Sequence, residues 1–122
     1  MGLDYDELSN QLINFDSGIR FAAIANNKGE LVAGGQKENV EQILSGDNVK
    51  MSIHYALQKR DLYTNLAYKI GKEKSSITEY EKVTLISIPI NSSDLLLIST
   101  EPRANYLSIV DFSLSIINSE SD

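Results

Sequence analysis

Residues 19–35, IRFAAIANNKGELVAGG, constrain the fold of this chain more than any other segment. Two apolar runs flank an Asn-Asn-Lys-Gly turn, whose residue types tolerate the positive φ angles of tight hairpins. The pattern predicts a β-hairpin with strands over residues 19–25 and 30–33. Gly34 and Gly35 are then expected to form the exit from the second strand.

The first strand of this hairpin is apolar on both faces. Ile19, Phe21 and the alanines at 23 and 25 alternate with Ala22 and Ile24, and Arg20 is the only polar residue. A strand that borders solvent on one side alternates apolar and polar residues, whereas a strand covered on both sides does not. We therefore expect this strand at the centre of a sheet with helices on both faces.

Composition limits the classes of partner. The chain has 122 residues, which suits a single domain spanning residues 1–122. It has no cysteine, which excludes disulfides and thiolate metal sites. Its net charge of −6 opposes binding to nucleic acid and to anionic membranes. Nothing in the sequence argues for export, so a cytoplasmic protein is expected. Protein or small-molecule partners fit this charge better.

The remaining elements follow from periodicity and capping residues. A first helix is predicted because Tyr5, Leu8, Leu12 and Phe15 recur at helical spacing, with Asp4 as its cap, Glu7 three residues later and Gly18 as its stop. Residues 39–68 predict a short helix ending near residue 46 and a long helix capped by residue 47 or 48. Three strands follow over residues 72–79, 82–90 and 95–100. A last helix is predicted to carry Pro102 in its first turn.

The predicted fold is α+β, with the element order α-β-β-α-β-β-β-α. The first and last strands are the most apolar and belong at the centre of the sheet, while the charged strand over residues 72–79 belongs at an edge. A five-stranded antiparallel sheet with the order 2-1-5-4-3 meets both conditions. The first and last helices then cover one face of the sheet and the long middle helix covers the other.

The long helix carries two apolar stripes instead of one. A helical projection groups Met51, Tyr55, Leu62 and Leu66 on one side, and about 120° or more away it groups a second set, Val49, Ile53, Ala56, Tyr63 and Ala67. A helix lying on a sheet needs a single stripe, so the other stripe must meet the rest of the domain, a partner or a ligand. Arg60 interrupts the second set, which favours the Met51 set as the buried face.

These patterns resemble the Roadblock/LC7 domains of the profilin-like group. The resemblance is carried by the hairpin with its Asn-Lys-Gly turn, the crossover helix, the three-stranded meander and the closing helix. The segments RFAAIANNKGELVAGG, EKVTLISIPI and LLLISTEP also look like those of a set of short archaeal proteins to which no activity is assigned.

The resemblance implies a function without catalysis. Roadblock domains are dimerisation and scaffold modules that serve small GTPases and motor complexes, and they pair through the crossover helix and the neighbouring edge strand. Carried over to this chain, the resemblance implies a homodimer, with a small GTPase as a candidate protein partner. The implied interface or pocket comprises Met51, Tyr55, Leu62 and Leu66, or the opposite stripe, together with the edge strand that contains Ile77.

Residues with catalytic or metal-binding chemistry are sparse. His54 is the only histidine and falls among polar residues of the long helix, where a solvated position is the simplest interpretation. Asp4, Asp6 and Glu7 suit helix capping as well as acid–base chemistry. The Gly34–Gly35 pair lacks the lysine and the spacing of a phosphate-binding loop. No catalytic residue, metal ligand or cofactor site is predicted.

Two alternatives to a scaffold stay open. A PAS-like sensor domain has the same strand order and holds its ligand between the sheet and the connecting helices. In that case Phe21 and the stripe that does not meet the sheet would line a pocket, and a sizeable cavity beside Tyr55 and Leu85 would favour this alternative. A small hydrolase or transferase is the other alternative, and no group of residues in the sequence supports it.

Overall fold

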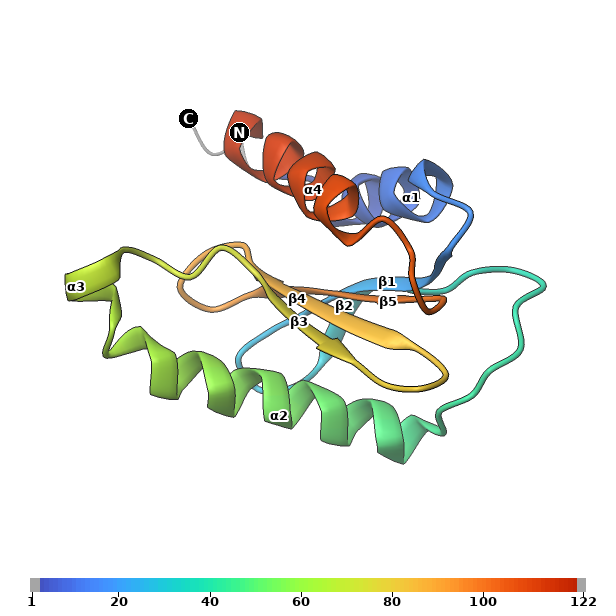
Figure 1. Cartoon of the computed structure of the whole chain (residues 1–122), viewed down its shortest axis with the longest axis horizontal. Coiled ribbons are helices and arrows are strands. Elements are labelled where there is room, and N and C mark those ends of the chain that lie inside the picture. Colours follow the sequence, from blue (N-terminus) through green and yellow to red (C-terminus); the bar gives the residue numbers. More distant parts are fainter. Residues whose placement is uncertain (1–2, 121–122) are drawn as a thin grey trace.

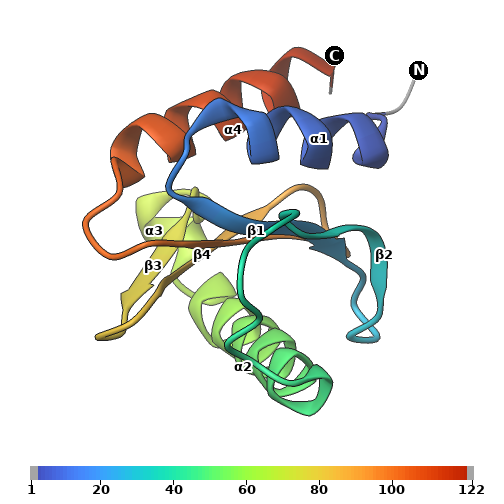
Figure 2. The ribbon, with the colours of Figure 1, turned by 90° about the vertical axis from the view of Figure 1, so that its right-hand side faces the viewer.

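A computed structural model describes residues 3–120 of the chain. An antiparallel sheet separates two helical layers, with α1 and α4 on one face and α2 on the other (Figures 1 and 2). The elements are α1 (Tyr5–Phe15), β1 (Ile19–Ala25), β2 (Leu31–Gln36), α2 (Gly46–Thr64), α3 (Ala67–Ile70), β3 (Ser76–Glu79), β4 (Thr84–Pro89), β5 (Leu95–Thr100) and α4 (Tyr106–Glu120).

The sheet has the order β2-β1-β5-β4-β3, which confirms the predicted order 2-1-5-4-3 and the α+β class. β1 and β5 are central and are the two most buried strands. One detail of β1 differs from prediction, because the pairing of β1 with β5 shifts register between Ile19 and Phe21. Ile19 therefore joins the core beneath α1 and α4, while Phe21 faces α2.

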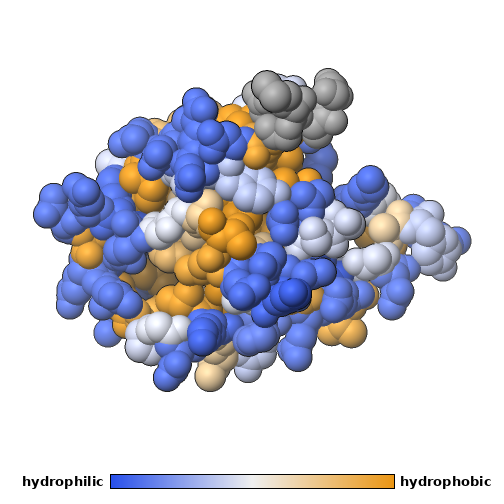
Figure 3. All heavy atoms as spheres, turned by 180° about the vertical axis from the view of Figure 1, so that it is seen from behind, coloured by the Kyte–Doolittle hydropathy of each residue, from blue (hydrophilic) through white to orange (hydrophobic). Residues whose placement is uncertain are grey.

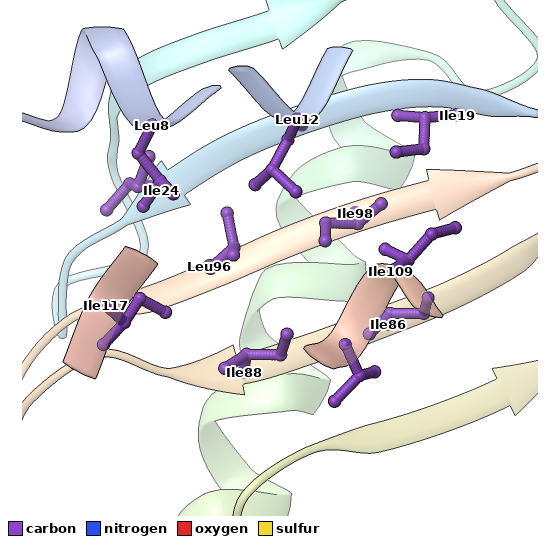
Figure 4. Close-up of a cluster of buried hydrophobic side chains, with 12 residues drawn as sticks. Leu8, Leu12, Ile19, Ile24, Ile86, Ile88, Leu96, Ile98, Ile109 and Ile117 are labelled. Carbon is purple, nitrogen blue, oxygen red and sulfur yellow. The ribbon is translucent and has the colours of Figure 1, made fainter. Parts of the chain in front are cut away.

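The main core lies between the sheet and the helices α1 and α4. Its floor is formed by side chains that β1, β4 and β5 direct to this face, and α1 and α4 close it from above (Figure 4). Phe15 of α1 stacks on Phe112 of α4 with ring centroids 4.0 Å apart. The buried members are Leu8, Leu12, Ile19, Ala22, Ile24, Ile86, Ile88, Leu96, Ile98, Ile109, Val110 and Ile117.

The predicted hairpin is present, and its second strand is longer than expected. Asn26 organises the turn, because its Oδ1 accepts hydrogen bonds from the amides of Lys28 and Glu30, both at 3.0 Å. β2 then continues through Gly34 and Gly35, so this pair lies within the strand and not at its exit. At Gly34 the backbone has φ +83° and passes very close to the backbone of β1.

The segment before α2 is not helical, contrary to prediction. Its carbonyl groups are used by side chains of the sheet, since Arg20 donates to the carbonyl of Glu41 at 2.6 Å and Gln36 donates to that of Val40 at 3.2 Å. The helix starts instead at Gly46. Its cap is Ser45, whose Oγ accepts from the amide of Asn48 at 3.2 Å.

Other boundaries also differ from prediction. The long helix, predicted to run to residue 68, ends at Thr64, and the separate short helix α3 follows it. β3 covers only the last four residues of the predicted strand. α4 starts at Tyr106, beyond Pro102, because Arg103 adopts φ 66° and donates its amide to the Tyr106 hydroxyl at 2.7 Å. Asn105 then caps α4 by accepting from the amide of Ser108 at 3.2 Å. The predicted cap of α1 is confirmed, since Asp4 accepts from the amide of Glu7 at 3.2 Å.

The β4–β5 turn links both helical layers. On one side Tyr5 of α1 donates its hydroxyl to Asp94 Oδ2 at 2.6 Å. On the other side Arg60 of α2 donates to the carbonyls of Asn91 and Asp94. Asn91 Oδ1 holds the turn in shape by accepting from the amides of Ser93 and Asp94, both at 2.9 Å.

Tyr5 predicts a pH-dependent contribution to stability. Burial, followed by the hydrogen bond to Asp94, raises the pKa of Tyr5 above its ordinary value of 10.0. The folded state therefore holds the phenol proton more tightly than the unfolded chain. The stabilisation is complete below pH 10 and is lost as the pH rises through the pKa of the folded state. Tyr5→Phe should lower the unfolding free energy at pH 7 by about 1 kcal/mol, and this deficit should shrink above pH 10.

Urea titrations at pH 7 and at alkaline pH measure the deficit. Tyr68→Phe serves as the control, since Tyr68 is strongly exposed and should change stability little at either pH. A Tyr5→Phe deficit that stays constant across this range would contradict the role assigned to the Tyr5–Asp94 bond.

Candidate functional site

One side of α2, which borders the groove described below, carries an exposed apolar stripe. Met51, Tyr55 and Leu62 lie on it, and Leu66 continues it just beyond the end of the helix; we call these four residues the outer stripe. Their exposed fractions lie between 48% and 70%. At 100° per residue they fall within about 60° of one another around the helix axis. The prediction that this set forms the buried face is wrong.

The other stripe faces the sheet instead, and Ile53 on it is only 1% exposed. The reason is Arg60, whose guanidinium reaches the carbonyls of the β4–β5 turn. The residue that interrupts this stripe is therefore its main polar anchor. His54 packs on the β1–β2 turn, where a Cβ placed on Gly29 would lie 3.1 Å from the imidazole Cε1. His54 thus contacts a turn and is not directed into a site.

A groove separates α2 from the sheet and has a volume of about 1140 Å³. Val49, Tyr55 and Ala56 line its helical wall, and Phe21 and Leu85 line its floor. Seen from behind, apolar surface is exposed between the α1–α4 pair above and α2 below, and the surface is hollowed there (Figure 3). The volume slightly exceeds the range of about 300–1,000 Å³ that is usual for small-molecule pockets.

Register places one row of floor residues directly across four strands. Thr78 on β3 pairs with Leu85 on β4, Leu85 pairs with Ser99 on β5, and Ser99 pairs with Phe21 on β1. All four residues line the groove, together with Leu97 in the neighbouring row. The floor is therefore mainly apolar, with hydroxyl groups at intervals.

Two cations of the groove have different surroundings. Arg20 is neutralised by Glu101, with 2.6 Å between Nη1 and Oε1. Lys59, half-buried on α2, instead donates to Ser76 Oγ at 3.0 Å and approaches Thr78 Oγ1 at 3.4 Å. Within residues 3–120 the Arg20–Glu101 contact is the one ion pair, so Lys59 has no carboxylate partner there.

Ile77 is separated from the other predicted site residues. It pairs with Ile86, which belongs to the core beneath α1 and α4, so Ile77 lies on the face of β3 opposite α2. The structure brings Met51, Tyr55 and Leu62 together at the groove, with Leu66 next in the stripe. Ile77 lies instead on an edge strand, because β3 pairs only with β4.

Sequence patterns singled out Phe21, Tyr55 and Leu85 as possible pocket residues but missed Lys59 and Ser99. The alternation of Leu85 with Ser87, and of Leu97 with Ser99, could have indicated which side chains share the α2 face. No local pattern distinguishes Lys59 from the other lysines, since its position depends on the rotation of α2.

The site offers apolar contact and a half-buried cation, Lys59, that has no carboxylate partner among residues 3–120. Among residues 3–120 no cluster of three or more His, Asp or Glu side chains is arranged to hold a metal ion. None of the helices in that range is long and apolar enough to cross a membrane.

A family model described as "Family of unknown function (DUF6659)" matches residues 3–120. The chain belongs to this family. No curated protein matches the chain.

Solved structures match the fold at low sequence identity. A Roadblock/LC7 domain from Streptomyces avermitilis superposes with a TM-score of 0.71 at 14% identity, covering 95% of this chain and 93% of that one. The gliding protein MglB from Thermus thermophilus gives 0.71 at 14% identity, covering 91% and 80%. Profilin from Schizosaccharomyces pombe gives 0.62 at 10% identity, covering 95% of each chain. The Roadblock/LC7-like, profilin-like architecture inferred from sequence is therefore confirmed.

Proposed function

We propose that this protein is a non-catalytic regulatory or scaffold module that acts as a homodimer and binds other proteins. The observation that carries the proposal is the outer stripe, four apolar side chains exposed along one face of α2 beside an unpaired sheet edge. Contiguous apolar surface of this kind marks interaction sites in soluble proteins.

A two-fold axis beside β3 would use both features at once. In a closed dimer the same patch meets its own copy, so the outer stripes of two α2 helices can pack together. The apolar surface continues past the stripe onto α3, where Tyr68 and Ile70 are also exposed. A stable dimer needs about 1,000 Å² of buried area or more, which a helix, α3 and an edge strand together can supply.

The edge strand supports pairing more strongly than its sequence suggested. The charged residues Lys72, Glu73 and Lys74 precede β3 and lie outside the strand, and within the strand only Glu79 is charged. Charges on an edge strand discourage association, and here most of them are displaced from the edge. Ile77 of each copy would then extend the opposite face of a continuous sheet.

The structural comparisons supply a precedent for self-association. One of the matching structures is described as MglB with tetrameric arrangement, and it superposes with a TM-score of 0.73 at 14% identity. By the resemblance to Roadblock domains, a small GTPase is a candidate partner in the cytoplasm. The net charge of −6 disfavours nucleic acid and anionic membranes as partners.

Sedimentation equilibrium at micromolar concentration tests the dimer. We expect a mass twice the 13.5 kDa of the chain. A strictly monomeric protein at high micromolar concentration would refute the proposal.

A second candidate function is a small-molecule sensor of the PAS-like kind. The groove of about 1140 Å³ favours it, because the groove lies beside Tyr55 and Leu85 where that hypothesis requires a pocket. Native mass spectrometry of the freshly purified protein tests it through a mass increment that disappears on denaturation.

A further inference from the structure

The groove between α2 and the sheet has a half-buried lysine at its β3 end and a mainly apolar floor. Lys59 lies over the β3 end, where Ser76 and Thr78 are its only hydrogen-bond partners within residues 3–120. From Thr78 the row of paired residues leads across Leu85 and Ser99 to Phe21 at the other end. The half-buried cation of Lys59 therefore lies at one end of a groove whose floor is mainly apolar.

The charge at the groove contrasts with the charge of the whole chain. Three cations, Arg20, Lys59 and Lys82, and two carboxylates, Glu41 and Glu81, line the groove, whereas the chain has a net charge of −6. Arg20 is already paired with Glu101 and Lys82 is exposed, which leaves the half-buried Lys59 as the cation that can receive a buried anion. A carboxylate at Lys59 would gain a charge-assisted hydrogen bond, with the hydroxyls of Ser76 and Thr78 as further donors.

We propose that the groove binds a single-chain carboxylate, a fatty-acid-like anion, with its head group at Lys59 and its tail across the sheet toward Phe21. The proposal rests on the second candidate function, the small-molecule site. Four strands span about 14 Å between the outer two, which matches the length of an extended dodecyl chain. The tail would cover Leu85 and meet Phe21, side chains that α2 leaves uncovered.

A second copy of the chain fits this groove less well. The outer stripe that a second copy would present contains no carboxylate to meet Lys59. Pairing through the outer stripe would instead lie at the mouth of the groove, since Met51, Tyr55 and Leu62 line it there.

Equilibrium dialysis with labelled dodecanoate and labelled dodecanol, both below their aggregation concentrations, tests the proposal. We expect one dodecanoate per chain, bound at least tenfold more tightly than dodecanol, in keeping with a hydrogen bond to a charged group. Lys59→Met, which keeps the aliphatic stem and removes the charge, should abolish this preference. Lys59→Gln, which can still hydrogen-bond Ser76, should weaken dodecanoate similarly, and circular dichroism verifies that both variants fold.

Lys50→Met is the matched control, because Lys50 is an exposed lysine of the same helix that does not line the groove. It should bind like the wild type. Equal affinity of the wild type for dodecanoate and dodecanol would overturn the proposed recognition of a carboxylate. It would leave the proposed small-molecule site itself standing. Equal losses in Lys59→Met and Lys50→Met would overturn the role of Lys59. Uptake of neither compound would overturn the proposal.

Discussion

Gly34→Ala is expected to destabilise the fold by about 3 kcal/mol or more, the largest effect we predict for a single substitution. Gly34 adopts φ +83°, and a Cβ there would lie 2.2 Å from the carbonyl oxygen of Ala22 and 2.7 Å from the Cα of Ala23. Both neighbours are backbone atoms of Ala22 and Ala23, which are fully buried in β1, so neither can move away cheaply. Relief requires β2 to separate from the centre of the sheet.

Gly46→Ala is the matched control for this prediction. Gly46 opens α2, has no positive φ, and a Cβ there would meet no atom within 4 Å. Alanine also favours the helix, so stability should be unchanged or rise by up to about 1 kcal/mol. Urea unfolding followed by circular dichroism measures both variants. Comparable stability of the two variants would contradict the close approach of β2 to β1.

Leu62→Glu is expected to weaken the proposed homodimer by about a hundredfold or more. Leu62 is 70% exposed in the single chain, so the substitution should leave the fold of one copy intact. Because a two-fold interface uses each residue twice, pairing would place two carboxylates in a mainly apolar contact. Sedimentation equilibrium should therefore show monomers at concentrations where the wild type is dimeric.

Leu107→Glu separates this effect from a general effect of surface charge. Leu107 is 74% exposed on α4, in the layer on the far side of the sheet from α2. This variant carries the same substitution at a similar exposure and should dimerise like the wild type. Dissociation by Leu107→Glu but not by Leu62→Glu would move the interface to the α1–α4 layer.

The predicted elements were reliable where local chemistry decides them. The Asn26 turn, the Asp4 cap and the bounds of β5 need only neighbouring residues, and each was predictable. Errors arose where a distant residue competes with the local preference. Arg20 and Gln36 take carbonyls that a helix before Gly46 would need.

The candidate site was only partly predictable for the same reason. Two stripes on α2 were visible in the sequence, and the need for a second binding surface followed from them. Which stripe meets the sheet was predicted wrongly, because an arginine within an apolar stripe looks unfavourable until its partners are known. Those partners are the main-chain carbonyls of Asn91 and Asp94, and no pattern of side chains in the sequence predicts them.

The amino-acid sequence alone determined the strand order and the two-sided covering of the sheet, because the apolar content of each strand reflects how many of its faces are buried. Only the tertiary structure decided the rotation of α2, the groove beneath it and the position of Lys59 over Ser76. A helix can turn about its axis at little local cost, so contacts with residues far away in the sequence select its orientation. The apolar hairpin thus defines the scaffold. The contacts of Arg60 with the β4–β5 turn orient α2 and so determine where the outer stripe and the groove lie.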